Sequence, residues 1–185
     1  MTGRCNVVFG FFYLVLTAAL GPVMVNNLPE IGQAQAGKQQ HMSALQLAAD
    51  NDFENAETLA PMTAAEVARA NSAALLALNT QMNAELTNTA IKAGPHAHGN
   101  LEALLNIVVG IVLMFLTVGV RFKQVISAVF ILGTLLHSGV LYLAVVFNLA
   151  WAGTLLGTGI GPVLILLGLL LAGVAAAMGW KKEVA

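Results

Sequence analysis

Two histidines and a glutamate stand close together at the start of one strongly apolar stretch. The sequence from position 95 to 102 is PHAHGNLE, in which His98 and Glu102 are four residues apart and follow His96. Residues four apart share one face of an α-helix, so the His98 imidazole and the Glu102 carboxylate point the same way. These donors suit zinc, copper and iron. The pattern predicts a metal or cofactor site with His96 as a third ligand; the alternative is a set of polar side chains at the level of the lipid headgroups.

A third histidine, His137, lies within the next apolar stretch. In both stretches polar or small residues recur at intervals of three or four, which places each set on one helix face: His98, Glu102, Asn106 and Gly110 in the first, and Thr134, His137, Ser138 and Tyr142 in the second. Unsatisfied polar groups are costly in lipid, so we expect the two sets to face each other as a polar seam. Within the seam we interpret Glu102 and His137 as functional, because ionisable groups in a membrane mark sites for protons, metals or cofactors. The supporting residues, which hydrogen-bond the helices together, are Asn106, Ser138, Tyr142 and Thr134.

A short basic turn, residues 121–123, sets which residues of the two stretches lie at equal depth. A turn this short makes the flanking helices antiparallel neighbours, so residues equally far from its centre are level. This rule sets Glu102 level with Tyr142. It places His98 about nine residues, or about 13 Å, from the level of His137. We therefore do not expect these two histidines to be the axial ligands of one haem; a haem b held by His137 with a ligand from another subunit, or a five-coordinate haem, stays open.

The composition is that of a membrane protein. The 185 residues are 58% hydrophobic and 9% charged, with a mean hydropathy of +0.80, whereas soluble domains average about 45–50% apolar and about 25% charged. A net charge of −1 offers no excess of positive charge for binding nucleic acid. Helices long enough to cross about 30 Å of hydrocarbon are expected over four stretches: 6–25, about 100–120, 124–148 and 162–180.

The basic residues predict how these four helices are oriented. Positive charge beside short loops marks the cytoplasmic face, and five basic residues lie at that face of a four-span layout: Arg4, Arg121, Lys123, Lys181 and Lys182. Both termini are then cytoplasmic and residues 26–95 lie outside, in a bacterial or archaeal cytoplasmic membrane. The expected fold is all-α, with a first transmembrane helix (1–25), an extracytoplasmic helical segment (26–95) and a three-helix transmembrane domain (96–185). A signal peptide is the alternative for the first helix.

The segment 26–95 is rich in Ala, Asn and Gln and has no β-branched run, so any structure in it should be helical. A helix is predicted from Met62 to Lys92, with Thr63 and Glu66 as a capping box at its start and Gly94 and Pro95 as its stop. Its apolar stripe is expected to pack on the membrane domain or on a partner: Val67, Ala74, Leu75, Leu78, Met82 and Leu86. Before it, we expect only a short helix around residues 43–49.

Glycines precede the last apolar stretch. Gly153, Gly157 and Gly161 recur every four residues, a pattern that lets membrane helices approach closely, and we assign them to helix packing. The alternative is a glycine-rich bend that faces a cofactor, a lipid or a partner. Pro162 is well placed at the start of a helix. Residues 149–161 are accordingly a loop, a bent half-helix or a re-entrant segment.

Motifs of soluble enzymes, such as a phosphate-binding loop or a C-x-x-C pair, are not found in the sequence. We therefore expect no catalytic residues, and a small accessory subunit of a larger redox or metal-dependent membrane complex, in contact with lipid and with other membrane subunits. It would contribute metal, haem or quinone contacts near the outer face. The alternatives are a self-contained metal- or haem-binding redox protein and a proton or ion pathway. The cofactor is unknown; copper, zinc, iron and haem b are the candidates.

Overall fold

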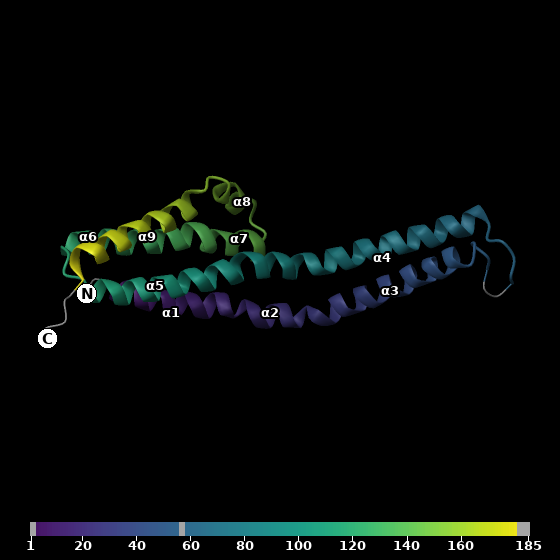
Figure 1. Ribbon diagram of the computed structural model, residues 1–185, viewed down its shortest axis with the longest axis horizontal. Coiled ribbons are helices and arrows are strands. Elements are labelled where there is room, and N and C mark those ends of the chain that lie inside the picture. Colours follow the sequence, from purple (N-terminus) through teal and green to yellow (C-terminus); the bar gives the residue numbers. More distant parts are fainter. Residues whose placement is uncertain (1–2, 56–57, 181–185) are drawn as a thin grey trace. The chain divides into compact units, whose positions relative to one another are not determined.

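The structure is a computed structural model that describes residues 3–55 and 58–180. These residues form helices and connecting turns, without β-strands (Figure 1). The α-helices are α1 (Arg4–Ala18), α2 (Leu20–Asn26), α3 (Leu28–Asp50), α4 (Ala64–Ile91), α5 (Ala97–Phe115), α6 (Val120–Thr134), α7 (Val140–Val146), α8 (Ala150–Leu156) and α9 (Ile160–Gly179). Two π-helical turns, η1 (Lys92–His96) and η2 (Leu135–Gly139), join α4 to α5 and α6 to α7. The predicted all-α class is confirmed.

Four helical stretches among the described residues are long and apolar enough to cross a membrane. They lie within Arg4–Asp50, Ala64–Phe115, Val120–Val146 and Ile160–Gly179. Length and composition therefore agree with the predicted integral membrane protein with four transmembrane helices.

The chain divides into two compact units. One, which we call the bundle, comprises the residues up to Pro22 and those from Ala90 onward; the other, which we call the hairpin, runs from Val23 to Thr89.

In the bundle, α1 packs along α5, while α6 and η2 pack along α9. Glycines allow these close approaches. A Cβ atom on Gly10 of α1 would lie 2.6 Å from the Ala103 carbonyl oxygen on α5, and one on Gly168 of α9 would lie 2.9 Å from the Phe130 ring on α6. Small residues at helix contacts are typical of membrane bundles, because backbone proximity maximises van der Waals contact.

An apolar cluster lies at the α5–α6 turn. Leu113, Ile126, Phe130 and Ala175, from α5, α6 and α9, are fully buried in it. Beside it a single bridge joins Leu116 to Trp180, so the end of α9 is attached to this turn. The cluster fixes three helices at one end of the bundle.

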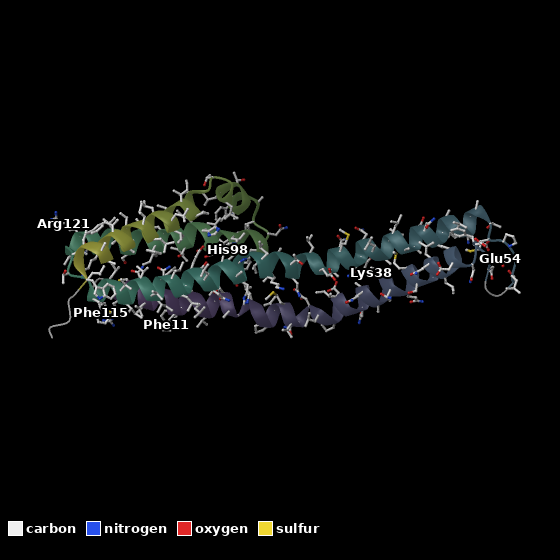
Figure 2. The ribbon with its side chains drawn as sticks, viewed as in Figure 1. Phe11, Lys38, Glu54, His98, Phe115 and Arg121 are labelled. Carbon is white, nitrogen blue, oxygen red and sulfur yellow. The ribbon has the colours of Figure 1, made fainter. Side chains whose placement is uncertain are left out.

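The turn between α5 and α6 differs from the prediction. It covers residues 116–119, and Arg121 and Lys123 lie in the first turn of α6 instead of in the loop. Figure 2 shows Arg121 and Phe115 at this end of the bundle. The helix ends where Leu116 adopts an extended conformation. Charge alone does not end a helix, since Arg and Lys are good helix formers.

The predicted helix stop at Gly94 and Pro95 agrees with the structure: α4 ends at Ile91, and a kink at the non-helical Gly94 (φ −100°, ψ −109°) separates it from α5. The chain passes through η1 into α5, and the non-helical conformation of Gly94 absorbs the kink. Pro95 follows this kink, so its missing N–H falls at the start of the next helical segment, where the first N–H groups have no intrahelical acceptor. His98 and Glu102 thus lie on a helix, α5, that follows a distorted turn.

The hairpin consists of α3 and α4, which run side by side and are joined by residues 51–63 (Figure 1). The expected short helix around 43–49 is wrong, because α3 covers 23 residues from Leu28. Pro29 lies at the helix start, where a missing N–H is harmless, and Ala and Gln then favour a helix throughout. The predicted capping box is confirmed: Glu66 accepts a bond from the Thr63 backbone N–H at 2.7 Å, and the Glu66 N–H donates to the Thr63 hydroxyl at 3.3 Å.

Half of the apolar stripe predicted on α4 is exposed. Leu75, Met82 and Leu86 are each more than 60% exposed, whereas Ala74 is 2% exposed. Two other residues of the stripe, Val67 and Leu78, are half-buried, as are the alanines at positions 70, 73, 77, 84 and 90. The groove between α3 and α4 is lined on the α4 side by three alanines, at positions 73, 77 and 84, and also by Leu76, Thr80 and Asn83.

The approach to the last helix contains the short helix α8, followed by a turn at residues 157–159. Gly159 adopts a left-handed conformation (φ 69°), which glycine tolerates without strain, and α9 begins at Ile160. Pro162 is thus the third residue of α9 and not the first. Its missing N–H still costs nothing there, because the first four N–H groups of a helix have no intrahelical acceptor.

Candidate metal site

Three of the four predicted ligands converge. One ligand atom each from His98, Glu102 and His137 lies within 4.8 Å of the others. Glu102 is buried, His137 is half-buried and His98 is exposed, so the cluster runs from the interior of the bundle to its surface. Figure 2 shows His98 among the side chains between α5 and α7.

Two elements position the three side chains. Regular α-helix in α5 places His98 and Glu102 on one face, as the four-residue spacing predicts. The π-helical turn η2 carries His137 and Ser138, which are adjacent in sequence yet both reach the Glu102 carboxylate. Adjacent residues of an α-helix point in directions about 100° apart. The wider π-turn relaxes this spacing, and such turns are frequent at functional sites.

The carboxylate of Glu102 is held on both oxygens. His137 Nδ1 lies 2.5 Å from Oε1, and the Ser138 hydroxyl donates to Oε2 at 2.6 Å. The Tyr13 hydroxyl, on α1, lies 2.9 Å from the Ser138 oxygen. Since Ser138 gives its proton to Glu102, Tyr13 is the donor in that bond. Three helical segments therefore fix the orientation of one buried carboxylate.

The residues level with Glu102 lie about one helical turn from the position that the depth rule predicts. Glu102 contacts His137 and Ser138, and not Tyr142, whose ring instead lies 6.0 Å from that of Phe147. The turn lies at residues 116–119 instead of 121–123, so the centre from which depth is counted lies earlier in the chain than the rule assumed.

The same displacement overturns the predicted separation of two histidines. The rings of His98 and His137 lie edge to face with their centroids 4.9 Å apart, where the rule expected about 13 Å. Bis-histidine haem between them is still disfavoured, but for the opposite reason. Rings in edge contact leave no room for a macrocycle between them.

Below the cluster, the polar seam continues as a buried hydrogen-bond network. Asn106 donates to Thr134 at 2.8 Å and to the Glu102 carbonyl at 2.9 Å. It accepts a bond from Asn6 of α1 at 3.0 Å, and Asn6 in turn exchanges hydrogen bonds with Ser127 of α6. Among the described residues, no buried polar side-chain atom lacks a partner. The seam thus links α1, α5 and α6, and its buried polar side chains are all hydrogen-bonded, so none of them is desolvated without a partner.

The contribution of α1 was missed from the sequence. Asn6, Tyr13 and Thr17 are buried and each reaches another helix. A signal was present: Asn6, Gly10, Tyr13 and Thr17 are spaced by four, three and four residues, which is one face of a helix. The apolar composition of this stretch concealed the pattern.

The fourth predicted ligand, His96, lies apart from the cluster. Its Nδ1 is 3.1 Å from the Thr17 carbonyl oxygen, and Asn100 lies 3.5 Å from the same nitrogen. Asn100 also accepts a bond from the Thr17 hydroxyl at 2.7 Å. The structure therefore places His96 in a contact between η1 and α1, as a residue that joins two helices.

The three glycines before the last helix fall into different environments. A Cβ atom on Gly161 would lie 2.5 Å from the His137 backbone nitrogen, so Gly161 permits α9 to touch η2. Gly153 meets nothing within 4 Å, and Gly157 meets only α8 itself. Neither of these two glycines makes a helix contact among the described residues, since the pattern spans a turn and not one continuous helix.

The cluster has the donor set of a transition-metal site. Two imidazoles and one carboxylate are ligands of zinc and of non-haem iron, and imidazole also suits copper. Donor atoms bound to one ion at about 2.1 Å in tetrahedral geometry lie about 3.4 Å apart. The present ligand atoms lie within 4.8 Å of one another, so metal binding requires a rearrangement of these side chains by an ångström or so, including an opening of the 2.5 Å contact between His137 and Glu102.

No family model, curated protein or solved structure matches this chain in the comparisons made.

Proposed function

We propose that this chain is a small integral membrane subunit that binds one transition-metal ion through His98, Glu102 and His137. The observation that carries the proposal is the convergence of these three donor atoms within 4.8 Å, from two separate helical segments. On binding, the contact between Glu102 and His137 is exchanged for bonds of both side chains to the ion. Ser138 keeps its bond to the other carboxylate oxygen and holds Glu102 in place.

The site belongs to the outer side of the membrane in this proposal. The support is the set of basic residues near the opposite ends of the spans, Arg4, Arg121 and Lys123 among them, which favours a cytoplasmic location for both termini. The segment 26–95 is then outside. His98, at the start of α5, lies next to that side.

We also propose that the protein works within a larger membrane complex of the redox or metal-dependent kind. The support is the hairpin, where Ala74 is the only buried residue among those described and large apolar side chains are exposed. Several exposed large apolar side chains on one extramembrane segment favour an interaction surface. A partner subunit would cover them, as the membrane covers those of the four spans.

The decisive experiment is metal analysis of the protein purified in mild detergent. We expect about one equivalent of copper, zinc or iron, lost in His98→Ala and His137→Ala and retained in the matched controls His96→Gln and His41→Ala. His96 lies in a helix contact and His41 in the hairpin, so neither belongs to the cluster. Equal metal content in all four variants would overturn the metal proposal.

The same preparation tests the accessory role. Co-purification with larger membrane subunits supports it. A protein that runs alone, with stoichiometric metal and activity of its own, would instead establish the self-contained metal protein.

A further inference from the structure

We infer that the metal site, if the proposed function holds, has one open coordination position that takes a small anionic ligand with an oxygen or nitrogen donor. The inference rests on the proposed function and adds to it the class of ligand. It follows from three features of the cluster: the number of its ligands, the hydrogen bonds that the neighbouring polar side chains already make, and its charge.

The cluster supplies three ligands, one fewer than a closed tetrahedral site. Structural zinc sites have four protein ligands, whereas catalytic sites have three and leave the fourth position to water or substrate. Among the described residues, the group that could hold a metal consists of His98, Glu102 and His137 alone.

The neighbouring polar side chains are already committed to other bonds. Ser138 bonds to Glu102 and Tyr13. Asn106 uses both amide hydrogens and its oxygen within the seam. Asn100 and His96 are tied to Thr17. Recruiting one of them as a fourth ligand would leave a buried partner unpaired, which costs about 1–3 kcal/mol.

The open position faces outward. Exposure rises from Glu102 (5%) to His137 (19%) to the exposed His98, while the tethering residues Tyr13 and Ser138 lie behind the carboxylate and are buried. The side of the ion turned towards the buried groups is therefore occupied, and an external ligand approaches from the side of His98.

The charge of the donor set selects an anion. Two neutral imidazoles and one carboxylate leave a divalent ion with a net charge of about +1. A net charge next to buried side chains is unfavourable, and a monoanion such as hydroxide, azide or formate removes it. A neutral donor of similar size leaves the charge in place and should bind more weakly.

The test uses the full chain in detergent, loaded with Co(II) or Cu(II) and titrated with sodium azide. Equilibrium dialysis first establishes that the metal binds. We then expect a saturable change in the visible absorption of the bound ion, with one azide per metal, and the same response in His41→Ala. Pyridine, a neutral nitrogen donor, should require a concentration at least about tenfold higher for the same occupancy.

The outcomes separate the two proposals. Failure to bind either metal would contradict the proposed function itself. Metal binding with no spectral response to azide would leave that function standing and overturn the open position, because the ion would then have a closed set of ligands. Equal affinity for azide and pyridine would overturn the preference for anions.

Discussion

The bundle and the hairpin are both helical, yet they use polar residues in opposite ways. In the bundle, Asn6, Asn106 and Glu102 are buried and satisfied by side chains from other helices. Among the described residues of the hairpin, the side-chain bonds between residues distant in sequence are those of Asn88 with Asn27 and the Met24 carbonyl, at one end of the two helices.

The two units also differ in what their apolar residues do. The bundle buries large side chains such as Leu113 and Phe130, whereas the described part of the hairpin buries only Ala74. A helical hairpin with so little buried area gains little from packing. The comparison shows that the bundle is built to hold fixed side-chain positions, and that the hairpin depends on further contacts. Chemistry that needs a preorganised site belongs in the bundle.

The largest expected effect is on buried amides. Asn106→Ala should destabilise the protein by about 3 kcal/mol, because it removes three buried hydrogen bonds, including the one that the amide donates to the Thr134 hydroxyl. Asn88→Ala, in the half-buried pair of the hairpin, should cost less than about 1 kcal/mol. Unfolding of both variants in detergent, followed by circular dichroism, measures the difference. Similar losses would mean that the two units do not differ in how they use polar groups.

Glycine replacement gives the next largest contrast. Gly10→Ala should destabilise by about 2 kcal/mol, because the new methyl group would lie 2.6 Å from α5 atoms. Gly32→Ala should instead stabilise α3 by up to about 1 kcal/mol, because nothing lies within 4 Å of the added carbon and alanine favours a helix. The thermal midpoint of Gly10→Ala should lie below that of the parent protein, and that of Gly32→Ala should lie above it. A midpoint lowered by Gly32→Ala would reveal a close contact on the hairpin.

Features that depend on local sequence could be predicted, and other features could not. Hydropathy located the four spans and the capping rules located the start of α4, because both depend on local sequence. The extents of α3 and of the α5–α6 turn were wrong. The extent of α3 was missed because its alanine-rich polar sequence has little hydrophobic periodicity. The turn was misplaced because two basic residues suggested a loop, whereas α5 ends before Leu116 and α6 begins after Gly119.

For the candidate site, the residues could be named but their register could not. His98, Glu102 and His137 stood out as ionisable groups in apolar sequence. The π-helical turn that brings His137 level with Glu102 has no simple sequence signal, since His137 and Ser138 also fit a regular helix. Tyr13 was missed because its importance depends on a bond to Ser138, far along the chain.

Metal affinity should depend on the bundle residues that orient Glu102 and should not depend on residues of the hairpin. Ser138→Ala should weaken metal binding about tenfold, because it removes the hydrogen bond to Oε2 while leaving the three ligands intact. Tyr13→Phe should have a smaller effect in the same direction, since it acts through Ser138. Isothermal titration with Zn(II) measures both, with His41→Ala as the control in the hairpin. An unchanged affinity in Ser138→Ala would show that the carboxylate needs no orientation.

The smallest effect concerns pH and falls on the hairpin. Bonds from the Thr63 backbone N–H and hydroxyl to the Glu66 carboxylate hold the pKa of Glu66 below its usual range. A carboxyl group with a lowered folded pKa stabilises the structure above its unfolded pKa, and this contribution is lost as the pH falls through the lowered value. Acidification below pH of about 4 should therefore fray the first turn of α4 before the bundle responds. Amide hydrogen exchange, resolved by residue, should show faster exchange at the start of α4 in acid, and Glu66→Gln should show that faster exchange already at neutral pH. If exchange there does not depend on pH, the capping bonds do not stabilise α4, and the loop before it must hold the helix end by other contacts.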